Sequence, residues 1–450
     1  MIRATDVALV SWCAARHRRA AREEIAEYRD ARLRRLVAHA YAAVPYYRGL
    51  LERHGVEPGQ IRTADDLARI PVTTRRDLQT APPASLVARG TDPASLIVHR
   101  TSGSSGEPVR VFRTWLEERL TSAFRLRALH DFGLRPRDRR VQFVQPRPHD
   151  ARNWEGPQRV IRALGFHGKI TLDRRLPAEE ILQQLQAVRP DAMTGTPDIL
   201  VRLARVMDRE RWDAVRPRLL IAGGAVLTEL LRRQIADGFG APVFDLYGSY
   251  EMGTIAWECP RAGGFHVADD GVVLEVLKEG RPAEPGETGE VVATQLHAFA
   301  APFIRYRLGD LAIRGETSCP CGSPFSTVVA VRGRVQVSLP LANGRLFRSA
   351  DLVHLMLEQP MQWVGQYQLV QERPDHVVLR AVPLRPPPPG AITTLEDAVC
   401  ERLGPGIGLE VRLVPEIPLD ANGKFEVVRS LVQSTYDQAE GEGPAPSRRS

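Results

Sequence analysis

Short runs of β-branched and other apolar residues alternate with helical stretches between about residues 90 and 330, and this alternation constrains the fold more than any other feature. Strands separated by helices are typical of an α/β body with a parallel sheet. We therefore predict a mainly parallel sheet that gives way to a β-rich part from about 265 to 330. The predicted strands are Leu96–Val98, Val141–Val144, Leu219–Ile221, Val243–Leu246, Val272–Val276 and Glu290–Thr294, and the predicted helices include 178–188 and 227–238.

Both ends of the chain differ from this body. The first residues have helical periodicity with many charged positions, which predicts a helical N-terminal segment over 14–55. After about residue 333, a new series of strand-like and helix-like stretches indicates a small α+β domain. We predict a large domain over 1–333, a small domain over 334–436 with strands at 365–371, 376–382 and 409–414 and a helix at 392–403, and a polar, disordered tail over 437–450.

The composition excludes several classes of protein. With 43% hydrophobic and 26% charged residues and no apolar run long enough to cross a bilayer, the chain has the composition of a soluble globular protein. The N-terminus lacks the apolar stretch and cleavage site of a secretory signal, so we expect a cytoplasmic protein. The formal net charge is +7, but the arginines are dispersed among acidic residues, which argues against nucleic-acid binding.

A loop rich in serine and glycine follows the apolar run Leu96–Val98. Glycines let backbone N–H groups turn toward an anion, and hydroxyl groups add donors, so such a loop can hold the phosphates of ATP. A flexible surface linker is the alternative, but linkers seldom lie between two apolar runs. The loop lacks the Gly-Lys-Ser/Thr ending of a Walker loop. It consists of Thr101, Ser102, Gly103, Ser104, Ser105 and Gly106, followed by Glu107 and Pro108.

Two further motifs place a carboxylate where a nucleotide could bind. The run 247–253 follows a predicted strand; there the ring of Tyr247 could flank adenine and the carboxylate of Glu251 could hold Mg²⁺. Asp310 follows the turn residue Gly309, where its carboxylate could accept both ribose hydroxyls. The simpler alternatives are a plain tight turn and a solvated turn residue.

Lys424 is one of three lysines in the chain and lies in the turn 420–425. A lysine presented in this way could stabilise the charge that develops between a carboxylate and the α-phosphate of ATP. A β-turn with a lysine facing solvent is the alternative.

Three of the five cysteines form a group with one histidine. Cys259 and His266 have a Cys-x6-His spacing, and Cys319 and Cys321 form a Cys-x-Cys pair. Three thiols and one imidazole suit tetrahedral zinc, and with four protein ligands such a site would be closed and structural. Unrelated loop cysteines beside a strand histidine are the alternative.

The remaining two cysteines, Cys13 and Cys400, fall in helix-like apolar patterns, so we expect both to be buried.

The order of the four motifs along the chain resembles that of the adenylate-forming superfamily, which contains acyl- and aryl-CoA ligases, luciferases and peptide-synthetase adenylation domains. The resemblance covers about residues 40–430 and is most specific to the phenylacetate-CoA ligase branch. It implies ATP-dependent activation of a carboxylic acid to an acyl-adenylate by a large domain and a mobile C-terminal domain. Its motifs are 101–108, 247–253, 305–310 and 420–425, with Tyr46–Arg48, Asp65–Leu67, Ile70–Pro71, Thr73–Thr74, Ala222–Ala225 and Gly286–Glu290.

The resemblance also implies roles for single residues. Lys424 and Glu251 would be catalytic, with Glu251 holding Mg²⁺, while Tyr247 would stack on adenine and Asp310 would bind the ribose. The other implied ATP contacts are Thr101, Ser102, Gly103, Ser104, Ser105, Gly106, Gly223, Gly224, Ala225, Gly248, Ser249 and Arg334, and the expected acid pocket comprises Phe143, Val144, Gly195, Thr196, Ala222 and Tyr250.

Departures from the family pattern leave the acyl acceptor open. Glu107 stands where relatives commonly carry lysine, and Gln336 lies where the hinge acid is expected. We expect ATP, Mg²⁺ and structural Zn²⁺ as cofactors, and CoA or a carrier pantetheine as the thiol acceptor. The alternatives are an amide synthetase that transfers the acyl group to an amine and a catalytically silent, zinc-stabilised scaffold. The resemblance favours an aromatic acid, and an acyl carrier protein and a homodimer are further candidate partners.

Overall fold

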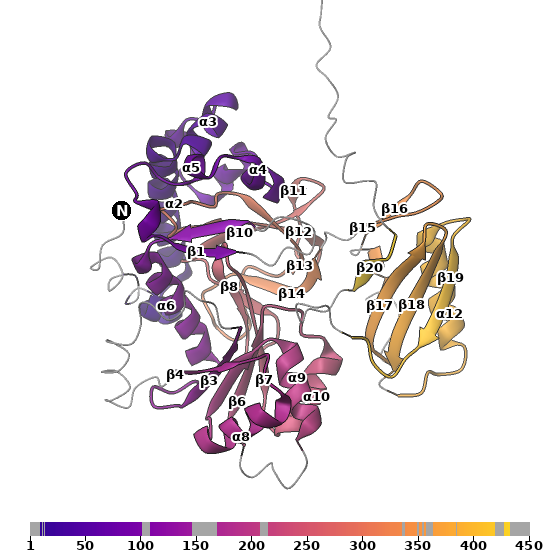
Figure 1. Cartoon of the computed structure of the whole chain (residues 1–450). Coiled ribbons are helices and arrows are strands. Elements are labelled where there is room, and N and C mark those ends of the chain that lie inside the picture. Colours follow the sequence, from indigo (N-terminus) through magenta and orange to yellow (C-terminus); the bar gives the residue numbers. More distant parts are fainter. Residues whose placement is uncertain are drawn as a thin grey trace, which may run out of the picture. The chain divides into compact units, whose positions relative to one another are not determined.

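The computed structural model divides into two compact units (Figure 1): residues 1–227 with 231–333, and residues 228–230 with 334–450. The backbone alone is described at 100, 332–334, 338 and 348. The predicted tail 437–450 and Cys13 lie outside the described residues. The structure describes residues 10, 12, 14–100, 109–145, 169–207, 215–334, 338–348, 351–352, 355–356, 363–383, 385–418 and 427–432.

The described part of the N-terminal unit contains one twelve-stranded sheet, in the order β11-β10-β12-β13-β14-β9-β8-β7-β6-β5-β3-β4. The pairs from β4 through β7 are parallel, whereas β7–β8, β8–β9, β9–β14, β12–β13, β10–β12 and β10–β11 are antiparallel. The predicted α/β class is confirmed, and its parallel and β-rich parts form a single sheet. The strands are β3 (Arg140–Val144), β4 (Lys169–Asp173), β5 (Ala192–Gly195), β6 (Leu219–Gly223), β7 (Val243–Ser249), β8 (Gly253–Glu258), β9 (Phe265–Val267), β10 (Val272–Lys278), β11 (Arg281–Pro282), β12 (Thr288–Gln295), β13 (Tyr306–Arg314) and β14 (Thr327–Arg334).

Helices cover both faces of the parallel strands because each strand is apolar on both sides. On β6, Leu219 and Ile221 belong to the core beneath α6, whereas Leu220 and Ala222 belong to the core beneath α8, α9 and α10. None of the described helices combines the length and apolar character that crossing a bilayer requires. The bounds are α6 (Trp115–Asp131), α8 (Ala178–Val188), α9 (Pro197–Val206) and α10 (Glu229–Phe239).

The predicted helical N-terminal segment packs against the β-rich part of the sheet. Buried residues of α2 and α3, such as Leu36 and Tyr47, share a core with Leu296, Phe299 and Ile304. A separate two-stranded sheet pairs β1 with β2. The elements are η1 (His17–Arg19), α2 (Arg22–Ala43), α3 (Pro45–Arg53), η2 (Pro58–Gln60), η3 (Ala64–Arg69), α4 (Arg75–Thr80), α5 (Pro83–Leu86), η4 (Pro93–Ser95), β1 (Ile97–Arg100) and β2 (Arg110–Arg113).

A buried ionic network joins this N-terminal segment to α6 and the sheet. Asp270 accepts hydrogen bonds from Arg127 Nη1 at 2.5 Å and His17 Nδ1 at 2.8 Å, and all three side chains are almost completely buried. The Asp270 backbone oxygen lies 2.9 Å from His297 Nε2. The guanidinium of Arg127 lies 4.9 Å from the ring centre of Trp257. The network therefore fixes three segments that are far apart in sequence.

The C-terminal unit contains a four-stranded sheet in the order β19-β18-β17-β20, a two-stranded sheet of β15 and β16, and α12. Helix α12 buries Leu395, Val399 and Leu403, one residue per turn. Cys400 is exposed because it lies one position beyond this stripe, so the expectation that it is buried is wrong. The bounds are β15 (Ser338–Pro340), β16 (Leu346–Arg348), β17 (Val364–Arg373), β18 (His376–Pro383), α12 (Ala391–Leu403), β19 (Gly408–Leu413) and β20 (Val428–Ser430).

Candidate active site and metal cluster

The predicted phosphate loop 101–108 and Lys424 lie outside the described residues, as does Gln336. Arg334 lies at the end of β14, and only its backbone is described. The strands on either side of the loop are described, and they pair as an antiparallel hairpin in which Arg100 is opposite Arg110. The strand residues that flank the loop, Arg100 and Arg110, are therefore held opposite each other.

Several of the predicted residues lie at the carboxyl ends of adjacent parallel strands. Gly195 on β5 is in register with Ala222 on β6, and Gly223 is in register with Leu246 on β7. A Cβ atom at Gly223 would lie 2.8 Å from the Leu246 backbone oxygen, so glycine is required for this close approach. The carboxyl edge of an open parallel sheet is where ligands of α/β proteins bind.

Two residues of the expected acid pocket are core residues. Phe143 and Ala222 both belong to the core under α8 and α9, and a Cβ at Gly195 would lie 3.0 Å from the Phe143 ring. Val144 is partly buried at the end of β3, and Tyr250 is exposed.

The structure joins the two residues expected to contact adenosine. Tyr247 lies on β7 and Asp310 on β13, and the Tyr247 hydroxyl donates a hydrogen bond to Asp310 Oδ2 at 2.7 Å. Both side chains are partly buried. One oxygen of the Asp310 carboxylate is thus positioned by the tyrosine. An aromatic ring and a carboxylate lie side by side at the edge where β7 ends.

The turn that carries Glu251 is tightly constrained. Gly253 has a φ of 76°, and a Cβ there would lie 2.6 Å from Thr121 Cγ2 on α6. The Ser249 hydroxyl accepts a hydrogen bond from the Met252 backbone N–H at 3.1 Å. Glu251 is buried, with 8% of its surface exposed. A single carboxylate held in this way fits Mg²⁺, which commonly takes one or two carboxylates together with substrate phosphates.

Sequence reasoning missed the residues that support this turn. Arg113 donates hydrogen bonds to the backbone oxygen of Tyr250 and, at 3.1 Å, to Glu118 Oε2. His99 Nε2 also lies 3.1 Å from Glu118 Oε2, and the His99 ring stacks on Tyr250 with centres 5.4 Å apart. Burial raises the pKa of Glu118, but the hydrogen bond from His99 and the charge of Arg113 lower it to about 2. A charged residue in a short strand looks like a surface residue, so no pattern marked Arg113.

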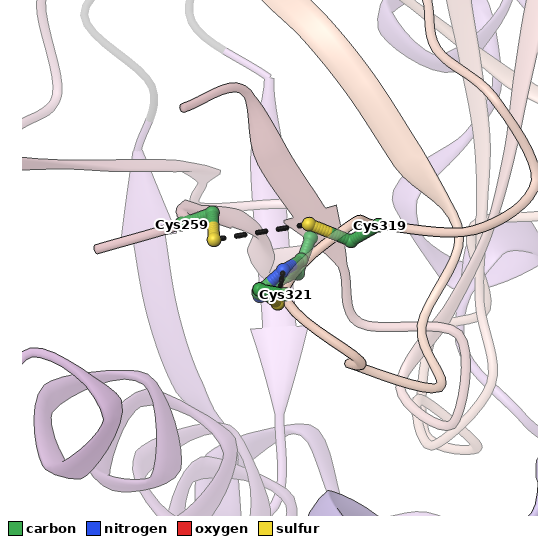
Figure 2. Close-up of side chains that lie close together, drawn as sticks. Cys259, Cys319 and Cys321 are labelled. Carbon is green, nitrogen blue, oxygen red and sulfur yellow. Dashed lines mark hydrogen bonds between the residues drawn. The ribbon is translucent and has the colours of Figure 1, made fainter. Parts of the chain in front are cut away.

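The four predicted zinc ligands are brought together, and their ligand atoms all lie within 4.8 Å of one another (Figure 2). The sulfur atoms of Cys259 and Cys319 are 3.8 Å apart, and Cys321 Sγ lies 3.3 Å from His266 Nε2. Two thiolates bound to one tetrahedral zinc at about 2.3 Å each are about 3.8 Å apart. The spacing of these two cysteines therefore fits zinc.

Local structure explains how residues 60 positions apart meet. Cys259 follows β8, and its turn is closed by a hydrogen bond from its own backbone N–H to the Gly264 oxygen. His266 lies on β9, which pairs with β8 on one side and β14 on the other. Cys319 and Cys321 lie in the connection that leads into β14. The Ala262 backbone N–H donates to Cys259 Sγ at 3.3 Å, as backbone groups around metal-bound thiolates do.

Comparison with known proteins agrees with this geometry. Residues 26–299 match the family model described as AMP-binding enzyme. The phenylacetate-coenzyme A ligase of Thermus thermophilus is 29% identical over 370 residues, covering 78% of this chain and 79% of the relative. The enzyme of the same name from Escherichia coli is 28% identical over 305 residues, covering 64% and 67%.

Solved structures show the same fold. A 2-hydroxyisobutyryl-CoA ligase in the postadenylation state, in complex with an acyl-AMP, superimposes with a TM-score of 0.69 at 21% identity, covering 92% of this chain and 91% of that chain. The family model and the phenylacetate-coenzyme A ligase relatives define the class of protein as adenylate-forming. The chain belongs to the AMP-binding enzyme family. The predictions of an adenylate-forming ligase and of the phenylacetate-CoA ligase-like branch are confirmed.

Proposed function

We propose that this enzyme activates a carboxylic acid with ATP and transfers the acyl group to the thiol of CoA. A carboxylate oxygen of the acid attacks the α-phosphorus of ATP and pyrophosphate leaves, which gives an acyl-adenylate. The thiolate sulfur of CoA then attacks the acyl carbon, and AMP leaves as the C–O bond breaks. The relatives named phenylacetate-coenzyme A ligase support both steps and an aromatic acid as the substrate class.

The observation that carries the proposal is the hydrogen bond between Tyr247 and Asp310. In the proposed complex the Tyr247 ring lies against adenine, while Asp310 accepts the ribose hydroxyls. Glu251 would hold Mg²⁺, which would neutralise charge on the phosphates. Lys424 would stabilise the charge developing at the α-phosphate. Glycines 223, 224 and 248, with Ala225 and Ser249, would line the path of the nucleotide.

The C-terminal unit has a separate role in the proposal. It carries Lys424, and movement of this unit between the half-reactions would withdraw the lysine after adenylation, with Arg334 near the hinge. Carrier pantetheine as acceptor, and a homodimer, stay predictions.

The experiment is ATP–pyrophosphate exchange with a panel of aromatic and aliphatic acids and no acceptor present. We expect exchange that depends on one class of acid and is lost in Lys424→Ala but retained in Lys278→Ala, whose lysine pairs with Glu287 on the surface. No exchange with any acid, from folded protein, would contradict adenylation. If AMP release requires an amine and does not depend on CoA, the enzyme is an amide synthetase and not a thiol ligase.

We also propose that Cys259, His266, Cys319 and Cys321 hold one structural Zn²⁺. All four positions of a tetrahedral ion would be filled by protein, so the ion would have no site for substrate. We expect one zinc per chain by elemental analysis of purified protein. Cys321→Ser should lose zinc and lower the melting temperature, whereas Cys400→Ser, the exposed cysteine of α12, should change neither. Equal zinc content in both variants would contradict the assignment.

A further inference from the structure

A cavity of about 430 Å³ lies beside the Cys/His cluster and is used by neither site described so far. Its wall includes Arg18 and Arg19 from the N-terminal segment and Arg261 from the turn between β8 and β9. Asp131 at the end of α6 and His266 on β9 complete the charged and titratable part of the wall. All of these residues belong to the N-terminal unit.

The carboxylate in this wall is already fully engaged. Asp131 Oδ1 pairs with Arg18 Nη2 at 2.6 Å, and Asp131 Oδ2 accepts a hydrogen bond from Trp257 Nε1 at 2.9 Å. Within the part of the chain that the structure describes, neither Arg19 nor Arg261 has a hydrogen-bond or ion-pair partner. Two guanidinium groups from separate segments thus line one cavity with their donors unused.

His266 belongs to the same wall, but its second ring nitrogen is buried. The residue is 4% exposed, its Nε2 faces Cys321, and its Nδ1 has no hydrogen-bond partner among the described residues. If Nε2 binds zinc, the proton of the neutral imidazole lies on Nδ1, and metal-bound histidines almost always donate that proton to an acceptor. A buried donor without an acceptor is costly. Because Nδ1 is itself buried, the donors that a ligand in the cavity can reach are those of the two arginines.

The charge balance also favours an anion. Three guanidinium groups line the cavity and Asp131 offsets one of them. A zinc ion with three thiolates and a neutral histidine carries one net negative charge, which offsets a second. One positive charge is left without compensation, and the planar arginine fork is suited to binding phosphate oxygens in pairs.

We propose that this cavity binds a phosphate-bearing small molecule, with Arg19 and Arg261 as its ligands. The volume lies in the range of small-molecule sites and exceeds the size of a single inorganic ion. The site is separate from the candidate nucleotide site, because none of the residues assigned to ATP lines it. The phosphate groups that suit this site belong either to CoA or to a separate effector molecule.

The test is isothermal titration of the full-length, zinc-loaded protein with inorganic pyrophosphate at saturating AMP, which fills the adenosine part of the nucleotide site. Pyrophosphate that binds at the phosphate loop should be the same in every variant, so binding in the cavity is taken from the difference between variants. The variant Arg19→Gln/Arg261→Gln should weaken pyrophosphate binding about tenfold or more, because each guanidinium supplies charged hydrogen bonds. The control Arg76→Gln/Arg137→Gln makes the same change of net charge at two exposed arginines outside the cavity and should bind like wild type.

Equal pyrophosphate binding by wild type and Arg19→Gln/Arg261→Gln would overturn the proposal, and so would binding that AMP abolishes. Competition by CoA would support the proposal and identify the ligand as the acceptor. Retained binding in the presence of CoA would support a separate phosphate-bearing effector. The inference is independent of adenylation, because Arg19→Gln/Arg261→Gln should retain ATP–pyrophosphate exchange.

Discussion

Removing the charge of Asp270 should destabilise the N-terminal unit by about 3–5 kcal/mol at pH 7, because Arg127 would stay buried without its counter-charge. The two side chains are 1% and 2% exposed. The pKa of Asp270 gives a second value for the stabilisation that its charge provides. Burial raises this pKa, but the charge of Arg127 and the hydrogen bond from His17 lower it from 3.8 to about 2, which corresponds to roughly 2–3 kcal/mol. This stabilisation is complete above pH 4 and is lost as the pH falls toward about 2.

The assay is urea unfolding of Asp270→Asn, Arg127→Met and the double variant, which together form a double-mutant cycle. Each single variant leaves one buried partner unpaired, so the double variant should be more stable than the sum of the single losses predicts, by about 2 kcal/mol or more. Asp173 and Arg175 form an exposed pair at 2.7 Å and provide the control. Their cycle should give a much smaller coupling, because solvent screens the attraction between exposed charges.

Strictly additive losses for Asp270 and Arg127 would refute this reasoning, since the two residues would then act independently. Equal coupling in the buried and exposed pairs would refute it as well, because burial would then play no part.

Two further predictions concern the candidate active site, and a third concerns Asp245 on β7. Tyr247→Phe removes the hydrogen bond to Asp310 and should raise the KM for ATP about tenfold with a smaller effect on kcat, measured by initial-rate kinetics. Gly253→Ala should cost about 1–3 kcal/mol in unfolding experiments and reduce exchange activity, because its φ and the contact with Thr121 displace the turn of Glu251. Burial and the nearby charge of Glu258 raise the pKa of Asp245 to about 7. Ionisation of Asp245 therefore destabilises the fold increasingly from pH 4 to 7. Asp245→Asn should raise the melting temperature at pH 8 and have little effect at pH 4.

The sequence predicted the elements whose side chains repeat with a simple period. Helix 178–188 was predicted at the bounds of α8 because Ile181, Leu182 and Leu185 form one apolar stripe. The grouping of three loop cysteines and one histidine predicted that these four side chains meet, as they do, while their binding of zinc stays a prediction. In both cases the signal is local in the sequence or carried by rare residues.

The residues that support the candidate active site show no such pattern in the sequence. Arg113 reaches Glu118 and the backbone oxygen of Tyr250, a contact across 137 positions that depends on how β2 packs beside the turn after β7. Phe143, which is expected in the acid pocket, is buried in the core beneath α8 and α9, and its contact with an acid stays a prediction. Which face of a strand meets a pocket depends on the register and on the covering helices, and neither can be read from one strand.

The separation of the zinc ligands along the chain bears on how the protein is made. During synthesis Cys259 and His266 emerge from the ribosome well before Cys319 and Cys321, which follow Cys259 by about 60 residues. Until then, the hairpin of β8 and β9 has only half of its proposed ligand set. Zinc can complete the cluster only after the chain leading into β14 has emerged, so a product that stops before residue 319 would gain nothing from the ion. Tightly bound zinc would thus mark chains in which synthesis has passed that point.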